Sequence, residues 1–463
     1  MATTLVWLRD DLRLADNPAL HAATGNGDDV ILCYVWDDES PGIRPLGGAA
    51  RWWLHHSLSA LDASVRALGG TLILRRGAAG STIPEMIRQT GATSVFWNRR
   101  YGLAERTVDA GLKDWCAKQG VAAASFKANV LFEPGEVRTG AGEPYKVFTP
   151  FWRACMDRTA PRGPFPAPRT LSGAGVPSDP LDSWNLLPTT PDWAHGLAET
   201  WTPGEDAAQH RLLDFLDSGV AGYRQARERP AVEGTSRLSP HLRFGEISPF
   251  SVWDAVQART DSSLTEDLRI FRTELGWREF CNQLLYFNPE LATRNYRSAF
   301  DAFRWEKSGR AEVSQWSAGS TGYPLIDAGM RQLWHTGWMH NRVRMATASF
   351  LVKNLLIDWR VGEQWFWDTL VDADAASNAA NWQWVAGSGA DASPYFRIFN
   401  PVTQSRKFDP DAEYLLRFVP ELRSANFPHE PWKESVEGYP APIVDLQESR
   451  QRALSAYQKL RGT

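Results

Sequence analysis

Short apolar stretches alternate with amphipathic stretches along residues 1–130. The apolar stretches, each of strand length, are residues 5–8, 30–36, 71–74, 94–97 and 121–126. Between them, residues 51–67 and 103–118 place apolar side chains at helical spacing. Asn17-Pro18 is typical of a helix cap followed by a proline in the first turn. This alternation predicts an α/β domain with a doubly wound parallel sheet over residues 1–130.

Proline then interrupts the pattern. Eight prolines, which helix interiors exclude, lie at Pro161, Pro164, Pro166, Pro168, Pro177, Pro180, Pro188 and Pro191. The segment is too long for an ordinary loop. We expect residues 131–202 to be a linker that crosses between two domains over the surface.

Helical periodicity dominates the rest of the chain. Thr202-Pro203, Ser239-Pro240 and Ser248-Pro249 each resemble a cap followed by a first-turn proline. Residues 327–333, 345–356 and 363–370 carry the spacing of helices. The pattern predicts an all-α domain over residues 203–463.

Composition changes this picture little. The chain has 463 residues, 43% hydrophobic and 22% charged, with a formal net charge of −4. That charge excludes a chain-wide basic surface but not a local basic face for nucleic acid. The four cysteines show no metal-binding spacing, and neither a signal peptide nor a run long enough to span a membrane is visible. We expect a cytoplasmic, monomeric protein without a metal.

The first turn of the predicted sheet, RDDLRLADNP, lacks the glycines of a dinucleotide fingerprint. Residues 232–239 instead combine a glycine, three hydroxyls and an arginine before a helix start. Hydroxyls and free backbone N–H groups there suit a phosphate, although a capped helix without ligand explains them equally well.

Two groups of chemically active side chains each share one face of a predicted helix. Glu274, Trp277 and Arg278 share one helix face, which fits either a binding site or a surface ion pair over a buried tryptophan. Asn341 and Met345 also share a face and would suit a planar heterocycle. His340 could donate a proton, but a lone histidine is more often structural.

Residues 370–400 are rich in Ala, Gly and Ser, and they hold paired acids, asparagines and tryptophans. Such small residues let a backbone or a flat ligand approach closely, but acids in a first helical turn also suit a simple capped helix. The residues alone leave the two interpretations open.

With these motifs in view, the chain resembles the photolyase/cryptochrome family over essentially its whole length. The resemblance is strongest in EGTSRLSP, ELGWREF, TGYPLIDAGMRQLWHTGWMHNRVRM and DADAASNAANWQW. It implies an N-terminal antenna domain and a helical domain that binds FAD and DNA. GWMHNRVRM is most similar to the enzymes that repair cyclobutane pyrimidine dimers, because six-four photolyases place a second histidine where Asn341 stands.

The resemblance also assigns the flavin residues. Tyr223, Thr235, Ser236, Arg237, Leu238 and Ser239 would hold the phosphates and ribityl chain, with Arg278 in the same pocket. Arg344 and Asp372 would form a salt bridge beside the flavin ring, and Asp374 would accept a hydrogen bond from it. Asn378 would face flavin N5; an amide there cannot easily give up a proton, which suits a reduced, anionic flavin.

For the substrate, UV-damaged DNA, the resemblance implies that Glu274 bonds the flipped thymines while Trp277 and Trp384 pack on them. Asn341 and Met345 would line the same cavity, and Arg227 and Arg342 would contact flanking phosphates. Trp382, Trp359 and Trp305 match the family's electron relay. The function implied is light-driven dimer repair. A cryptochrome-type photoreceptor is the alternative, and a dark flavin oxidoreductase is a third hypothesis.

The antenna chromophore is harder to infer. Glu105 matches an acid that contacts the pterin in folate-using relatives, although Ala104 stands where some of these carry asparagine. We expect methenyltetrahydrofolate, with a deazaflavin as the alternative. RWWLHHSL suggests a variant subgroup with the antenna near Trp52 or Trp53.

Overall fold

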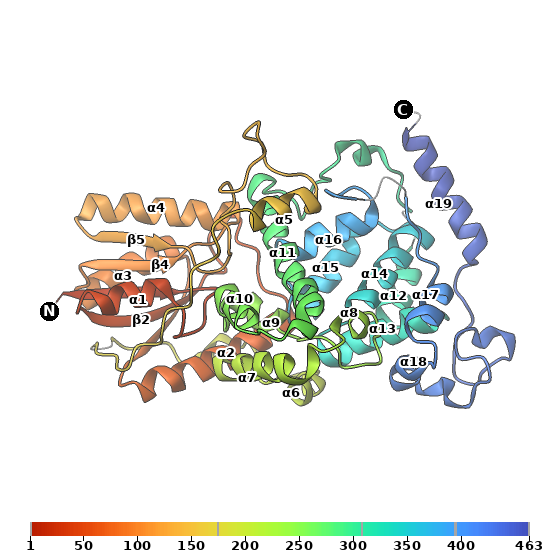
Figure 1. Ribbon diagram of the computed structural model, residues 1–463, viewed down its shortest axis with the longest axis horizontal. Coiled ribbons are helices and arrows are strands. Elements are labelled where there is room, and N and C mark those ends of the chain that lie inside the picture. The colour runs from red at the N-terminus through yellow and green to blue at the C-terminus, as the bar shows by residue number, and fades with distance from the viewer. Residues whose placement is uncertain (1, 174–175, 307–308, 393–395, 462–463) are drawn as a thin grey trace.

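A parallel sheet with flanking helices forms one side of the molecule, and a larger helical assembly forms the other (Figure 1). The computed structural model describes residues 2–173, 176–306, 309–392 and 396–461.

The sheet contains five parallel strands in the order β3-β2-β1-β4-β5. Their bounds are β1 (Thr3–Leu8), β2 (Asp29–Trp36), β3 (Leu72–Arg76), β4 (Ser94–Asn98) and β5 (Ala122–Phe126). The connecting helices are α1 (Pro18–Gly25), α2 (Gly48–Ala67), α3 (Ala79–Thr90) and α4 (Leu103–Gln119). Two hydrophobic clusters involve alternate residues of the central strands, so both faces of the sheet are buried. The predicted strands and doubly wound class are confirmed.

The turn after β1 explains why acidic residues stand where a nucleotide fingerprint would need glycines. The carboxylate of Asp11 accepts hydrogen bonds from Arg9 N and Asn98 Nδ2, both at 2.6 Å. Asp10 instead pairs with Arg243 of the helical half at 2.8 Å. The two acids therefore hold the turn and join it to the other half of the molecule.

Gly245 marks how closely the two halves approach. A Cβ at this position, where φ is +65°, would lie 2.0 Å from the carbonyl oxygen of Asp10. Leu12 N also donates to Phe244 O at 3.1 Å. Only glycine fits such a backbone contact without displacement.

The proline-rich segment 131–202 contains α5 (Phe148–Met156), which contacts α11, and α6 (His195–Thr200), which contacts α13. None of the eight prolines lies within a helix. Two loops of this segment therefore carry short helices that pack on the larger half.

The helical half contains no strand in its described residues. Its α-helices are α7 (Glu205–Asp214), α8 (Tyr223–Ala226), α9 (Ser239–Phe244), α10 (Pro249–Gln257), α11 (Thr265–Phe287), α12 (Arg310–Ala318), α13 (Pro324–Thr336), α14 (Asn341–Ser349), α15 (Trp359–Thr369), α16 (Ser377–Ala386), α17 (Pro401–Phe408), α18 (Glu413–Phe418) and α19 (Leu446–Arg461). The predicted all-α class is confirmed. No helix in the described ranges is long and apolar enough to cross a membrane.

Of the three helix caps predicted in the helical half, one is confirmed. Ser248 caps α10 by accepting from Ser251 N at 2.9 Å, as predicted. The other two predictions are wrong. Helix α7 begins at Glu205, with Gly204 at its N-cap, and Ser239 makes no capping bond because its hydroxyl donates to Asp372 at 2.7 Å. The Ser239 hydroxyl is therefore engaged by Asp372, which is distant in the sequence, rather than by a backbone N–H of its own helix.

Candidate active site

A cavity that is open to solvent lies between α11, α14, α15 and α16. All seven residues predicted to contact DNA line it: Arg227, Glu274, Trp277, Asn341, Arg342, Met345 and Trp384. Four residues predicted for the flavin or the relay line it too: Arg344, Asp372, Asn378 and Trp382. Residues more than 150 positions apart in the sequence therefore share one cavity, which we call the helical cavity.

Glu274 projects from α11 and pairs with Arg227 at 2.6 Å. Burial raises the pKa of Glu274, and the neighbouring Arg227 partly opposes that rise. The carboxyl group is thus held at the cavity wall by a cation, ready to accept a hydrogen bond from a planar ligand.

Arg342, at the start of α14, forms an ion pair with Glu228. Glu228 also lies 3.8 Å from Arg227. Two arginines and two glutamates therefore alternate along the cavity mouth. A phosphate that binds either arginine must compete with an internal acid.

Two indoles from different helices line the cavity. Trp277 of α11 stacks on Phe148 with ring centroids 3.7 Å apart. The Nε1 of Trp384 in α16 donates to Asp391 O at 3.0 Å. The stacking holds one face of Trp277, and the hydrogen bond holds the edge of Trp384, so both indoles are fixed at the cavity wall.

The base of the cavity carries a bidentate ion pair. Arg344 bonds Asp372 at 2.8 and 3.1 Å, and its Nε donates to Met339 O at 2.7 Å. Asp372 is buried and also accepts from Ser239. The pair is therefore held rigidly, as a salt bridge beside a cofactor ring requires.

Asn378 lies in the first turn of α16 with both amide hydrogens engaged. Its Nδ2 donates to the main-chain oxygen and to Oε1 of Glu363, each at 2.9 Å. The side chain of Glu363 is buried on α15 and pairs with Arg44 at 2.7 Å. Sequence reasoning missed Glu363 and Arg44. The one available signal was an acid in a tryptophan-rich helix, WRVGEQWFW.

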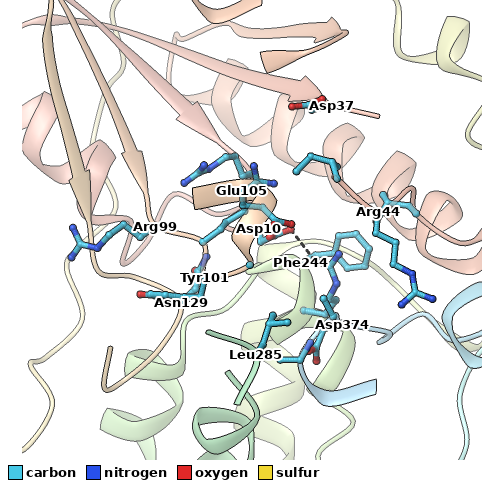
Figure 2. A pocket seen from close by; sticks show the side chains of 18 of the residues that line it. Asp10, Asp37, Arg44, Arg99, Tyr101, Glu105, Asn129, Phe244, Leu285 and Asp374 are labelled. Atoms are coloured by element: carbon cyan, nitrogen blue, oxygen red, sulfur yellow. Dashed lines mark hydrogen bonds and ion pairs between the residues drawn. The ribbon is translucent and has the colours of Figure 1, made fainter. Parts of the chain in front are cut away.

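Asp374 and Arg278 do not line the helical cavity. They line a second cavity between the two halves, together with Asp10, Glu105 and Phe244 (Figure 2). The carboxylate of Asp374 accepts from Ala376 N at 2.9 Å and Ser377 N at 2.6 Å, which caps α16. The segment from Asp372 to Asn378 thus separates this interdomain cavity from the helical one.

The interdomain cavity is rich in arginine. Arg9, Arg44, Arg99, Arg100, Arg243 and Arg278 all line it. The Nε and Nη2 atoms of Arg100 are buried and find no hydrogen-bond partner among the described residues. Buried guanidinium groups without partners are costly, so an anionic ligand would fit here. Trp53 stacks behind Phe244 with centroids 6.1 Å apart, one layer away from the cavity.

The predicted phosphate loop lies apart from both cavities. Tyr223 is buried against Phe215 and Phe271. Arg237 has a φ of +50° and pairs with Glu233 at 3.2 Å. Thr235, Ser236 and Leu238 belong to the same loop, which reaches the helical cavity through the bond from Ser239 to Asp372.

The three predicted relay tryptophans differ in exposure. Trp382 is 3% exposed and Trp359 is fully buried, whereas Trp305 is half-buried and packs on Phe303 at 4.4 Å. Helix α15, which carries Trp359, presses against Trp382: a Cβ on Gly362 would lie 2.1 Å from that indole. Trp382 therefore lines the cavity, Trp359 is buried in the neighbouring helix, and Trp305 is the most exposed of the three.

His340 has the structural role. Its Nδ1 accepts from Arg342 N at 3.2 Å and so caps α14. Burial, together with the neighbouring arginines, lowers the pKa of His340 to about 4. The imidazole is therefore neutral at physiological pH and is no proton donor.

FAD fits the helical cavity on three observations. The buried Nε1 of Trp382 finds no protein partner among the described residues. No described residue donates to Asn378 Oδ1. The Arg344–Asp372 pair supplies opposite charges on one wall, as a polar ring system needs.

Comparison with known families identifies both halves of the chain. Residues 4–169 match the family model of DNA photolyase. Residues 271–459 match the model of the FAD binding domain of DNA photolyase. The chain thus contains a FAD-binding domain where the helical cavity lies.

Individual relatives give the same result. The chain is 50% identical to a deoxyribodipyrimidine photo-lyase of Agrobacterium fabrum, over 100% of this chain and 99% of the relative. It is 35% identical to cryptochrome-1 of Arabidopsis thaliana, over 99% of this chain and 70% of that one.

Two solved structures are similar throughout. A bacterial class III photolyase from Agrobacterium tumefaciens superposes with a TM-score of 0.96 at 49% identity, covering 100% of this chain and 98% of that chain. An archaeal photolyase from Sulfolobus tokodaii with two FAD molecules has a TM-score of 0.83 at 30% identity, covering 99% and 100%.

Proposed function

The chain belongs to the photolyase/cryptochrome family, and we propose that it repairs cyclobutane pyrimidine dimers in DNA with absorbed light. Residues 203–463 are then the catalytic domain that binds FAD and DNA, and residues 1–130 the antenna domain. The observation that carries the proposal is the helical cavity, in which every residue assigned to the dimer shares a wall with residues assigned to the flavin.

Bound in this cavity, FAD would supply the light-excited electron that splits the dimer. The chain's own residues would orient it. The Arg344–Asp372 pair and Asn378 would hold the flavin ring. Asp374, which caps α16 on the interdomain side, would support the segment that carries Asn378. Tyr223 and the loop from Thr235 to Ser239, joined to the cavity by the bond from Ser239 to Asp372, would hold the part of the cofactor that extends beyond the cavity, with Arg278 on the interdomain side.

On the substrate side, Glu274 would accept a hydrogen bond from the flipped bases, held in place by Arg227. Trp277 and Trp384 would stack on them, while Asn341 and Met345 would complete the wall. Base–aromatic stacking contributes about 1–3 kcal/mol per base. The poor stacking of the lesion within the duplex lowers the cost of flipping it out.

Trp382, Trp359 and Trp305 would carry electrons from the surface to the cavity. The position of Trp382 at the cavity and the greater exposure of Trp305 support this direction. The relay would return the bound flavin to its reduced working state.

The photoreceptor alternative is less well supported, because identity to the Agrobacterium photolyase exceeds identity to the plant cryptochrome. The test is blue light on thymine-dimer DNA with chemically reduced protein. We expect dimers to disappear in light and persist in the dark. Persistence in light, with flavin bound, would exclude repair, and turnover in the dark with NADH would favour an oxidoreductase.

For the antenna we propose the interdomain cavity. Glu105 lines it, and the unpartnered Arg100 atoms suit an anionic chromophore. Methenyltetrahydrofolate fits Glu105, with a deazaflavin second; the Sulfolobus relative carries a second FAD instead. An absorption spectrum of the purified protein distinguishes these chromophores, and Glu105→Gln should remove a folate band while FAD remains.

We also propose that the protein acts as a cytoplasmic monomer. The four cysteines are buried and unpaired, which suits a reducing compartment. Both cavities are formed by one chain, so the repair chemistry needs no second copy.

A further inference from the structure

One arginine of the sheet half reaches the floor of the flavin site. Arg44 lies in the loop before α2, at the edge of the interdomain cavity (Figure 2). Its guanidinium group bonds both carboxylate oxygens of Glu363 in α15, at 2.7 and 2.9 Å. Arg44 is the cation that pairs with Glu363 in the described residues.

The loop that carries Arg44 is docked firmly on α15. The guanidinium group lies 3.9 Å from the ring centre of Trp367, whose Nε1 donates to Pro45 O at 2.9 Å. A Cβ on Gly47 would lie 2.2 Å from Trp367 O. Such close backbone contact leaves the arginine little freedom to move away.

Glu363 in turn decides how the amide of Asn378 points. Both groups of Glu363 that contact Asn378 are acceptors, the main-chain oxygen and Oε1. Only the amide nitrogen can donate to them, so Asn378 Oδ1 must face the helical cavity. A displaced Glu363 side chain would weaken this requirement.

We propose that Arg44 is a positioning residue of the flavin site: by holding the Glu363 carboxylate in place, it keeps the carbonyl oxygen of Asn378 turned toward the flavin. The inference rests on the proposed function, which places Asn378 beside flavin N5. Reduced flavin carries a hydrogen on N5 and oxidised flavin does not. An acceptor at that point therefore stabilises the reduced state over the oxidised state.

The bidentate geometry explains why arginine is needed. Its planar fork matches the two carboxylate oxygens and still leaves Oε1 open to Asn378, whereas a lysine would supply one point charge. The Arg44–Glu363–Asn378 chain thus joins a loop of the antenna domain to Asn378, 334 positions later in the sequence. Through Asn378 the loop would affect the redox preference of the cofactor.

The test is the midpoint potential of the bound flavin in Arg44→Gln, Arg44→Lys and a matched control, measured in the dark by dye titration. The control is Asp368→Ala, which removes another loop–α15 contact, the 2.8 Å bond from Gly48 N, and leaves Glu363 paired. We expect Arg44→Gln to lower the reduced-to-oxidised ratio about tenfold, about 30 mV for a two-electron couple. Arg44→Lys should give a smaller shift and Asp368→Ala none.

An unchanged potential in Arg44→Gln, or an equal shift in Asp368→Ala, would overturn the inference and leave the proposed function intact. If Arg44→Gln does not fold, Arg44→Lys decides, since wild-type behaviour there would mean that the fork is not needed. Flavin that binds with the expected shifts but repairs no DNA would contradict the proposed function alone. A protein that binds no flavin would overturn both.

Discussion

The carboxyl group of Glu274 has a partner within the protein and is also exposed to the proposed substrate site. Its carboxyl group pairs with Arg227 on one side and faces the helical cavity on the other. Glu274→Ala should weaken binding of dimer-containing DNA and lower repair per photon about tenfold, because a hydrogen bond to a charged group contributes about 1.5–3 kcal/mol. Flavin content, read from absorbance, should not change.

The matched control is Glu266→Ala in the same helix. Glu266 is exposed and pairs with Arg269. The Glu266→Ala variant should repair DNA at the wild-type yield. Equal yields for both variants would remove Glu274 from the substrate site.

A second glutamate of α11 gives a prediction about stability. Glu279 is 2% exposed and accepts from Phe132 N at 3.0 Å, while its Oε1 lacks a hydrogen-bond partner among the described residues. Burial raises the pKa of Glu279 from 4.5 to about 7, opposed by Arg278. The folded state therefore binds more protons than the unfolded state between these pH values, so this contribution to stability is full below pH 4.5 and is lost as pH rises through 7.

Glu279→Gln keeps the acceptor for Phe132 N and removes the titration. The variant should flatten the decline of unfolding free energy across this range and gain roughly 3 kcal/mol over wild type at pH 8, at about 1.4 kcal/mol per pKa unit. Urea unfolding at pH 5 and pH 8 measures both. A wild-type pH profile in the variant would refute the raised pKa.

Single residues also show what sequence can and cannot predict. Ser248 caps α10 through a bond to a residue three positions away, so its role follows from local pattern. Arg44 and Glu363 meet across 319 positions, and no local spacing indicates that contact. Glu228 was missed for the same reason: its partner Arg342 lies 114 positions later.

At the scale of elements, the tryptophan relay depends on how α15 packs on α16. Trp305→Phe or Trp382→Phe should slow photoreduction of the oxidised flavin at least tenfold, because phenylalanine cannot carry the electron at this energy. Repair by chemically reduced protein should persist. Flavin absorbance under blue light measures photoreduction, and the loss of dimers measures repair.

Trp316→Phe is the control for the relay. Its ring lies 6.3 Å from Trp382 but outside the proposed path, and it is fully buried. Photoreduction should survive this change. If all three variants lose it equally, the path through Trp359 and Trp305 is wrong.

Elements were predicted more completely than their ends or their contacts. Short apolar stretches predicted all five strands, and helical spacing predicted the all-α half. Pattern could not predict that the segment from Asp372 to Asn378 separates two cavities, since that depends on how α16 packs against α11, α14 and α15. Asp374 therefore faces a cavity different from the one that Asp372 and Asn378 line.

Across the whole molecule, a net charge of −4 means that DNA must be held by local cations. Arg342→Ala should flatten the dependence of log affinity on log salt by roughly one unit, since each phosphate contact contributes about −0.9. Fluorescence anisotropy with dimer-containing duplex at several salt concentrations measures the slope. Arg269→Ala, remote from the cavity mouth and paired with Glu266, serves as control.

A slope unchanged in Arg342→Ala would mean that Arg342 stays with Glu228 rather than binding phosphate. Glu228→Gln then becomes informative. Removing the competing acid should strengthen DNA binding if either neighbouring arginine contacts a phosphate.

The central claim is that flavin and lesion meet in the helical cavity. Electron transfer from light-excited, reduced flavin is fast only at contact range, so its fluorescence lifetime reports that meeting. We predict that saturating dimer-containing oligonucleotide shortens the lifetime, whereas the undamaged oligonucleotide of the same sequence leaves it unchanged. Equal lifetimes, with binding of both confirmed by anisotropy, would contradict the account.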